Sequence, residues 1–462
     1  MQGVVGYEER TILGEKNQDL TTGPIDRKLL VFALPLLFGS VVQQLYSTVD
    51  LIFVGNVIDS SASAAIGAST MLITCLIGFF GGMGIGAGVV IAQSWGERDP
   101  DKLCRAIRNT AALALAGGVF LAVLGWLLAP GYLRLIRTPE EIRISAAAYL
   151  RIYFLSLPSI VVYNFGAGML RALGDSRYPL RAQLVGGLTN VAADWLFLHV
   201  LSDGVVGVAW ASLFSQTVAA LLVLLKLRGL DGRYALRIRE IRFDPVLLRK
   251  TFAIGLPAGA QALVITLSNV VVQAHINSFG ADAIAAFTAY FKVELIIYLP
   301  IMALGQAIMT FSGQNCGAGQ FARIRRGTRD CLLISLGLTA ILSAVSLLFG
   351  GALFRLFIKE PSVIALGRRI IAVTFPYYVL YPVHQILGDS LRGQGKTKVP
   401  MLIVLLNLCL IRSALLFWIV PHTRSIQSVA AAYPVTWGLT ALGMCVYYCS
   451  ENGLISKRKR QN

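Results

Sequence analysis

Long apolar stretches recur along almost the whole chain, and they constrain its fold more than any other feature. Twelve segments reach the roughly twenty residues that a helix needs to cross a hydrocarbon layer. They cover residues 29–55, 64–94, 108–130, 144–170, 180–201, 204–227, 249–279, 283–313, 331–357, 367–391, 400–421 and 426–450. With 56% hydrophobic and only 14% charged residues, the composition excludes a soluble chain of 462 residues.

The residue types within these segments predict helices. All twelve are mixtures of Leu, Ala, Val, Ile and Gly. They lack the alternation of polar and apolar residues over about ten positions that marks an outer-membrane barrel. We therefore expect an all-α integral membrane protein with twelve transmembrane helices.

The positive charge of the chain follows a pattern that predicts its topology. The formal net charge is +17, with 41 Lys and Arg against 24 Asp and Glu. If the amino terminus is inside, the cytoplasmic segments hold thirty Lys and Arg and the opposite loops hold nine. This bias predicts that both termini lie in the cytoplasm. We expect the protein to lie in the inner or plasma membrane of the cell. The charge is thus explained without a nucleic-acid partner.

An internal repeat divides the chain into halves. At an offset of 221 residues, matching residues recur in order: Gly84, Gln93, Gly96, Leu170, Arg171, Gly174 and Pro179 meet Gly305, Gln314, Gly317, Leu391, Arg392, Gly395 and Pro400. Each half holds six predicted spans, so both begin on the same side and the repeat is parallel. We expect two six-helix bundles, with a tail at 1–28, a first lobe at 29–228, a basic linker at 229–248, a second lobe at 249–450 and a basic tail at 451–462.

The ordered motifs resemble the multidrug and toxic compound extrusion (MATE) family of secondary antiporters. In the first half the resemblance lies in Ala33-Leu34-Pro35, Ile91-Ala92-Gln93, Leu170-Arg171 and Gly174-Asp175; in the second it lies in Gly255-Leu256-Pro257, Gly305-Gln306-Ala307, Gly313-Gln314-Asn315 and Leu391-Arg392-Gly393. It implies alternating access between two lobes and efflux of amphipathic or cationic compounds, driven by protons or sodium ions. The combination of Asp50 with Asn190 and Asp194 is similar to the coupling site of the DinF-like prokaryotic branch.

Asp50 is the first buried charge that asks for an explanation. An ionisable side chain in mid-membrane costs about 2.5–3.5 kcal/mol on insertion scales. Asp50 ends a polar stripe that includes Gln43 and Tyr46, on a helix that Pro35 is expected to bend. We interpret Asp50 as the acceptor of a proton or sodium ion, and Gln43 and Tyr46 as substrate-binding residues. The alternative is that Asp50 is solvated near the outer interface or makes a structural hydrogen bond.

Asn190 and Asp194 lie four residues apart in one span, so their side chains share a helix face. With Asp50 they could share one proton or surround a sodium ion with oxygen ligands, and Ser212 on the next span could add a hydroxyl. The alternative is a polar pair that only holds helices together.

Glu294 is the acidic residue of the second half with an aromatic setting. Tyr290 lies one turn away on the same face, so the carboxylate and the ring could together hold an organic cation. The alternative is an ion pair of Glu294 with Lys292 or Arg412. Gln261 makes the span 249–279 polar enough to line a cavity, although packing explains it equally well. Asp389 lies beside a cytoplasmic loop, so no ion site is expected there.

No cofactor is expected besides the coupling ion. The four histidines lack the spacing of metal ligands, so the only metal we expect is sodium at Asp50, Asn190 and Asp194. Motifs for nucleotide binding or enzymatic chemistry are missing. The expected partners are the lipid bilayer and small amphipathic or cationic substrates, bound by a monomer. The alternative function, flipping a lipid-linked saccharide, would favour a cavity rich in Arg and Lys. Apart from the Lys and Arg residues counted with the loops, the spans contain only Lys292 and Arg412.

Overall fold

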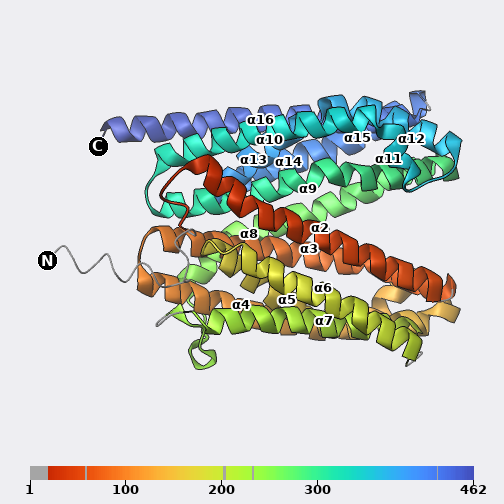
Figure 1. Ribbon diagram of the computed structural model, residues 1–462, viewed down its shortest axis with the longest axis horizontal. Coiled ribbons are helices and arrows are strands. Elements are labelled where there is room, and N and C mark those ends of the chain that lie inside the picture. Colours follow the sequence, from red (N-terminus) through yellow and green to blue (C-terminus); the bar gives the residue numbers. More distant parts are fainter. Residues whose placement is uncertain (1–18, 58–59, 201–203, 231–233, 424, 462) are drawn as a thin grey trace. The chain divides into compact units, whose positions relative to one another are not determined.

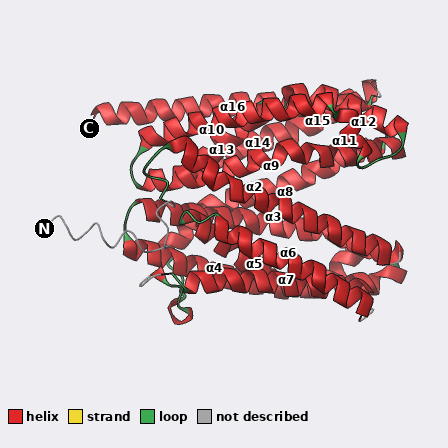
Figure 2. Cartoon of the chain, in the orientation of Figure 1, coloured by secondary structure: helices red, strands yellow, loops and turns green. Residues whose placement is uncertain are grey.

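The computed structural model describes most of the chain. The described residues are 19–57, 60–200, 204–230, 234–423 and 425–461, and the side chains of 50–71, 199–200, 204–205 and 452–461 lie outside the description. Helices form the regular structure throughout this part of the chain, which contains no strand (Figures 1 and 2).

The helices of the first half are long and connected by short loops. They are α2 (Ile25–Val57), α3 (Ser60–Gly96), α4 (Pro100–Leu135), α5 (Glu140–Ala172), α6 (Arg177–Trp195) with the π-helical extension η1 (Leu196–Val200), and α7 (Gly204–Arg228). The start of α4 shows how a side chain caps the first turn of a helix. Asp99 caps it by accepting hydrogen bonds from the backbone amides of Asp101 and Lys102.

The second half is more interrupted. A short 3-10 helix, η3 (Ile238–Glu240), precedes α8 (Pro245–Asn277), α9 (Ala281–Gly317), α10 (Phe321–Leu348), α11 (Gly350–Arg355), α12 (Pro361–Thr374), η4 (Phe375–Tyr377), α13 (Leu380–Gly393), α14 (Lys398–Val404), the π-helix η5 (Leu405–Ile411), α15 (Arg412–Thr423) and α16 (Ile426–Gln461). The predicted span 400–421 therefore corresponds to α14, η5 and α15 in succession.

Ten helices in the described residues are long and apolar enough to cross a membrane, and eleven if one bent pair counts as a single span. The remaining predicted segment, 180–201, corresponds to α6 and η1. This helix is less apolar because it carries Arg181, Gln183, Asn190 and Asp194. Its polar residues therefore set it apart from the others in any measure based on hydropathy.

The bent pair interrupts the predicted span 367–391. Pro361–Tyr377 and Leu380–Gly393 meet at an angle of 52°. Pro376 lies in the intervening 3-10 turn, and proline has no backbone N–H to continue a helical hydrogen-bond pattern. The expected single span is thus long enough to cross a membrane but is not one straight helix.

The chain divides into two compact units, and two helices belong to both. Unit 1 contains Leu34–Gly259, and unit 2 contains Gly23–Ala33 and Ala260–Asn462. Their limits fall inside α2 and α8, and each of these helices has an internal proline close to that limit, Pro35 and Pro257. The lobe limits expected from the sequence stay a prediction.

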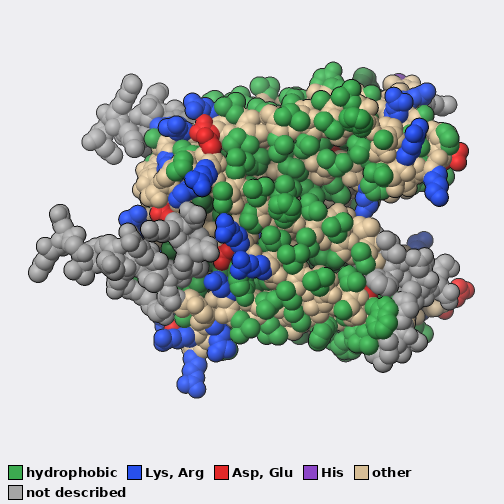
Figure 3. Space-filling model, viewed as in Figure 1, with side chains coloured by type: hydrophobic (Ala, Val, Ile, Leu, Met, Phe, Trp, Pro, Cys, Tyr) green, Lys and Arg blue, Asp and Glu red, His purple; other side chains and the backbone are tan. Residues whose placement is uncertain are grey.

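Each unit has its own apolar core. In unit 1 the buried core includes Leu121, Leu133, Leu150, Phe154 and Phe165 of α4 and α5. In unit 2 it is built around α9, α12, α13 and α16, with Phe287, Tyr290, Phe375, Tyr378 and Trp437 among its largest members. Hydrophobic side chains also cover the helices externally on the face shown in Figure 3, whereas Lys and Arg gather toward helix ends. This outer surface suits contact with lipid.

Glycines bring α3 and the first half of α8 into backbone contact within unit 1. A Cβ added at Gly82 would overlap the backbone of Gly259, and one added at Gly86 would lie 2.5 Å from the carbonyl oxygen of Thr251 and 2.6 Å from the nitrogen of Gly255. Small residues four apart on both helices allow this approach. It explains two of the glycines of α3, Gly82 and Gly86.

Candidate functional site

The predicted coupling residues of unit 1 lie partly within the described structure. Asn190 and Asp194 are buried on α6, with 5% and 0% of their surface exposed. Ser212 lies half-buried on α7, a helix that packs against α6. Position 50 belongs to α2, but the Asp50 side chain lies outside the described residues, so its contacts with the other three are untested.

A polar network joins α2, α5 and α6 one to two turns before these residues. The Gln183 amide nitrogen donates to Gln43 Oε1 at 3.1 Å, and the Tyr163 hydroxyl donates to Gln183 Oε1 at 3.1 Å. Tyr46 lies over Gly187 of α6, where an added Cβ would be 3.1 Å from Tyr46 Cδ1. The predicted residues Gln43 and Tyr46 therefore both contact α6, the helix that carries Asn190 and Asp194.

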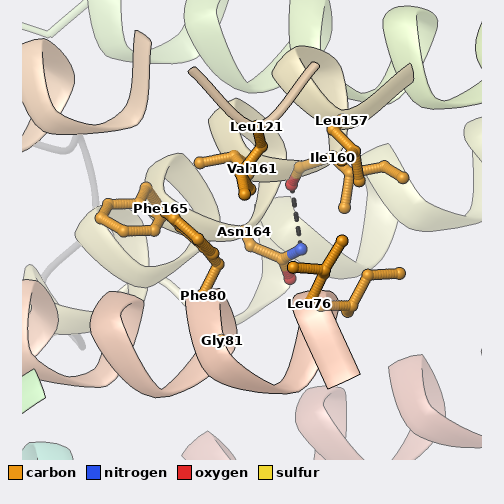
Figure 4. A pocket seen from close by; sticks show the side chains of 10 residues that line it. Leu76, Phe80, Gly81, Leu121, Leu157, Ile160, Val161, Asn164 and Phe165 are labelled. Carbon is orange, nitrogen blue, oxygen red and sulfur yellow. Dashed lines mark hydrogen bonds between the residues drawn. The ribbon is translucent and has the colours of Figure 1, made fainter. Parts of the chain in front are cut away.

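The small cavity in unit 1 is not suited to a drug-sized molecule. Its volume is about 10 Å³, and its lining is apolar except for Asn164. Figure 4 shows Asn164 between Phe165 and Leu76, with its amide nitrogen bonded to the carbonyl oxygen of Ile160 at 2.9 Å. A space of this size is near the minimum for a single water molecule.

In unit 2, Glu294 accepts hydrogen bonds from two tyrosines. The Tyr378 hydroxyl donates to Glu294 Oε1 at 2.9 Å and the Tyr290 hydroxyl donates to the same oxygen at 3.3 Å. Tyr290 has no exposed surface, so it supports the carboxylate from the core. Glu294 itself is half-buried. No ion pair of Glu294 occurs within the part of the chain that the structure describes, so the alternative, an ion pair with Lys292 or Arg412, is not observed there.

Arg412 is buried apart from Glu294, next to aromatic side chains. Only 6% of it is exposed, and its Nε and Nη2 donate to Thr436 Oγ1 at 3.2 and 3.0 Å. Its guanidinium lies 4.5 Å from the ring centre of Tyr433. Trp437 lies between the surroundings of Arg412 and those of Glu294. The centre of its ring is 5.8 Å from that of Tyr433 and 4.7 Å from that of Tyr378. Unit 2 thus combines an acidic group, a basic group and a continuous set of aromatic rings.

A second polar cluster in unit 2 surrounds Asp389. Arg392 Nη1 donates to Asp389 Oδ1 at 2.5 Å, and Arg392 Nη2 donates to Gln261 Oε1 at 2.9 Å. The Gln385 amide nitrogen donates to Asp389 Oδ2 at 2.7 Å. The structure therefore links the predicted residue Gln261, on α8, to the end of α13. A cluster of three or more metal-binding side chains does not occur among the described residues.

Sequence reasoning missed the contribution of α13 and the residues just before it to the two clusters. Tyr378 lies just before this helix, and Gln385, Asp389 and Arg392 lie on it. The repeat offered one signal: Arg392 matches Arg171, but Asp389 matches Gly168, so an acid appears in only one half. Which side chains this acid meets depends on the bend before α13, which the sequence did not reveal.

Comparison with known families decides the identity of the fold. The family model MatE matches the chain twice, over residues 35–196 and 257–418. The chain belongs to the MatE family. From 35 to 257 and from 196 to 418 the shift is the same 222 residues, which confirms the internal repeat and the all-α fold class with duplicated halves.

Individual relatives of this MatE protein match over most of their length. The chain is 27% identical over 430 residues to "Probable multidrug resistance protein YoeA" of Bacillus subtilis, covering 91% of this chain and 93% of that protein. It is 22% identical to "Multidrug export protein MepA" of Staphylococcus haemolyticus, covering 80% and 82%. The structure of an outward-facing multidrug resistance MATE family transporter matches with a TM-score of 0.90 at 20% identity, covering 96% and 99%. At this identity the structural match establishes the fold alone.

Proposed function

We propose that this MatE protein exports amphipathic organic cations from the cell in exchange for protons or sodium ions. The observation that carries the proposal is the family match over both repeats, together with relatives that are named as multidrug resistance and export proteins. Export by exchange requires a site for the organic cation and a site for the coupling ion. The two units provide one candidate for each.

Unit 2 offers the binding site for the cation. Glu294 supplies a carboxylate whose Oε1 is held by Tyr290 and Tyr378. The hydroxyl bonds fix its orientation, so the other oxygen remains for a positively charged substrate. Nearby aromatic rings add cation–π attraction and apolar surface. Gln43, Tyr46 and Gln261 are the further residues to which we assign substrate contact.

Unit 1 offers the coupling site, and the register of its helices supports this assignment. Gln43 meets Gln183 and Tyr46 meets Gly187, so α2 and α6 run in the same direction with an offset of 140 to 141 residues. The same offset brings position 50 of α2 level with 190–191 of α6. Asp50 would then join Asn190 and Asp194, with Ser212 on the adjacent helix. Two carboxylates and an amide suit either a shared proton or a sodium ion.

Transport would follow from a change in α2 that this site controls. Pro35 removes a backbone donor and weakens α2 at one position. Protonation or sodium binding would remove repulsion between the two carboxylates and so change how α2 packs beyond that proline. We assign the protein to the cell membrane as a monomer with both termini in the cytoplasm, in contact with the lipid bilayer and without a cofactor other than the coupling ion.

Export of a fluorescent organic cation from proteoliposomes tests the proposal. Purified protein is reconstituted, and efflux is followed under an imposed proton gradient or an imposed sodium gradient. The variants are Asp50→Asn, Asp194→Asn and Glu294→Gln, with Asp282→Asn as a matched control because Asp282 is exposed in the first turn of α9. We expect gradient-driven efflux to fall at least tenfold in the first two variants and to persist in the control.

The outcomes separate the roles of the two units. Glu294→Gln should weaken the apparent affinity for the cation and leave the choice of coupling ion unchanged. If Asp50→Asn transports like the wild type, the coupling role does not belong to Asp50. If the wild-type protein moves no organic cation under either gradient, the exporter proposal is wrong, and a lipid-linked saccharide becomes the next substrate to assay.

A further inference from the structure

One of the differences between the matching helices of the two halves concerns a charged residue. At an offset of 221 residues, Arg171 and Arg392 correspond, but Gly168 in α5 corresponds to Asp389 in α13. In unit 1 a Cβ added at Gly168 would lie 3.8 Å from the carbonyl oxygen of Gly84. In unit 2 the space beside the matching Gly305 is occupied by the Asp389 carboxylate, against which any Cβ at Gly305 would collide. The carboxylate is therefore a feature of the second half.

The Asp389 carboxylate belongs to a chain of four polar side chains. Gln385 donates to Asp389, and Arg392 donates to both Asp389 and Gln261, at 2.7, 2.5 and 2.9 Å. The side chains of Arg392 and Asp389 are only 11% and 7% exposed. Three members lie on α13, and Gln261 lies on α8. Among the described residues, the bond to Gln261 is the only hydrogen bond that joins these four side chains to a helix other than α13.

Stability alone is a poor explanation for such a buried pair. Removing two charges from water offsets much of their attraction, and apolar replacements are often as stable. What an apolar pair lacks is a directed donor. The planar guanidinium of Arg392 presents several N–H groups in fixed directions, so one can bond Asp389 while another bonds Gln261.

This geometry decides which end of the Gln261 amide is available. An arginine only donates, so it must face the amide oxygen and not the amide nitrogen. The NH₂ group then points elsewhere, and it has no hydrogen-bond partner among the residues that the structure describes. Gln261 is half-buried, so part of its side chain is accessible. Gln261 thus turns its two N–H donors away from Arg392, while its carbonyl oxygen is directed at Arg392.

We propose that Arg392, held by Asp389, is a positioning residue that makes Gln261 select substrates with a hydrogen-bond acceptor. The inference rests on the proposed function, in which Gln261 contacts the exported cation. The preferred substrate class is then an organic cation that also carries a carbonyl or ether oxygen. Glu294 recognises the positive charge, and the Gln261 amide recognises the oxygen.

A matched pair of competing cations tests this selection. One is a quaternary ammonium ion with an aryl ketone, and the other has a methylene in place of the carbonyl. Each is titrated against efflux of the fluorescent cation from proteoliposomes, and the ratio of their inhibition constants is measured. For the wild type we expect the ketone to bind about three- to tenfold more tightly, the effect of one hydrogen bond.

Three variants test which residues determine the ratio of the inhibition constants. Gln261→Leu should bring the ratio to about one. Arg392→Lys keeps a positive charge beside Asp389 but loses the planar fork, so the ratio should fall while the protein still folds. Gln273→Leu is the control, because Gln273 lies exposed on the same helix and bonds only its neighbour Asn277 at 2.8 Å among the described residues; its ratio should match the wild type.

A merely structural role for Arg392 predicts a different result. Arg392→Lys would then lower the maximal efflux rate and leave the ratio intact, which would overturn the positioning role. A wild-type ratio of one, or an unchanged ratio in Gln261→Leu, would overturn the selection itself while export remains measurable. If the wild type exports no cation at all, the proposed function is wrong and this inference falls with it.

Discussion

At the scale of single residues, the Asp389 cluster depends on one glycine. Gly305 of α9 faces the Asp389 carboxylate so closely that a methyl group would overlap Oδ2. We expect Gly305→Ala to destabilise the protein by about 1–3 kcal/mol, the usual effect of forcing extra atoms into a packed site. The measurement is thermal unfolding in detergent. Gly337→Ala is the control, since a Cβ there meets nothing within 4 Å.

The ion pair itself gives a second prediction. Arg392→Met removes one partner and leaves the Asp389 charge buried, so we expect a loss of about 3 kcal/mol. The double variant Arg392→Met with Asp389→Leu removes both charges and should recover most of that loss. Thermal unfolding of both variants measures the difference. A double variant as unstable as Arg392→Met would mean that the unpaired charge is not the cause.

Some residues of the candidate sites could be predicted from the sequence, and others could not. The free-energy cost of a charged side chain in the hydrocarbon layer identifies Asp194 and Glu294 as residues that need a function. This cost can be inferred without knowing which helices are neighbours. The same reasoning could not identify Tyr378 or Trp437, because buried aromatics are ordinary core residues by sequence. Their relevance depends on distance to Glu294 and Arg412, which tertiary structure alone provides.

At the scale of helices, the contact between α3 and α8 predicts a strong positional contrast. A Cβ at Gly82 would overlap the α8 backbone, whereas a Cβ at the preceding Gly81 would meet nothing within 4 Å. We expect Gly82→Ala to lower stability by about 2 kcal/mol or more, because backbone cannot move aside as a side chain can. Unfolding of the two variants is compared in the same detergent. Equal effects of the two substitutions would contradict this helix contact.

Hydropathy predicts where helices occur better than how they run. The expected span 283–313 lies within the uninterrupted helix α9, because length and apolar content suffice to identify it. The span 367–391 contains a bend of 52°, and the span 331–357 ends in the separate helix α11. Such interruptions come from local backbone chemistry and from neighbouring helices, which an average over about twenty residues does not resolve.

At the scale of the whole molecule, the charge bias predicts orientation. We expect green fluorescent protein fused after Asn462 to fluoresce and alkaline phosphatase fused there to be inactive, since the former matures in the cytoplasm and the latter outside it. Insertion of the same reporters near Arg137, in the turn between α4 and α5, should give the opposite result. The reason is the excess of thirty cytoplasmic Lys and Arg over nine. Matching signals at both sites would contradict the topology.

The exchange of helix segments between the two units affects the order in which the protein can be completed. Gly23–Ala33 is synthesised before Leu34–Gly259 of unit 1 but belongs to unit 2, where Arg323 Nη2 donates to the carbonyl oxygen of Gly23 at 2.9 Å. Unit 1, in turn, includes the first turns of α8, which the ribosome makes only after the linker. Neither unit is complete when translation reaches the middle of the chain. A ribosome that stopped after the linker would therefore leave an incomplete first half in the membrane. The glycines on α3 would be exposed because α8 is missing, and the segment Gly23–Ala33 would lack its contact with α10.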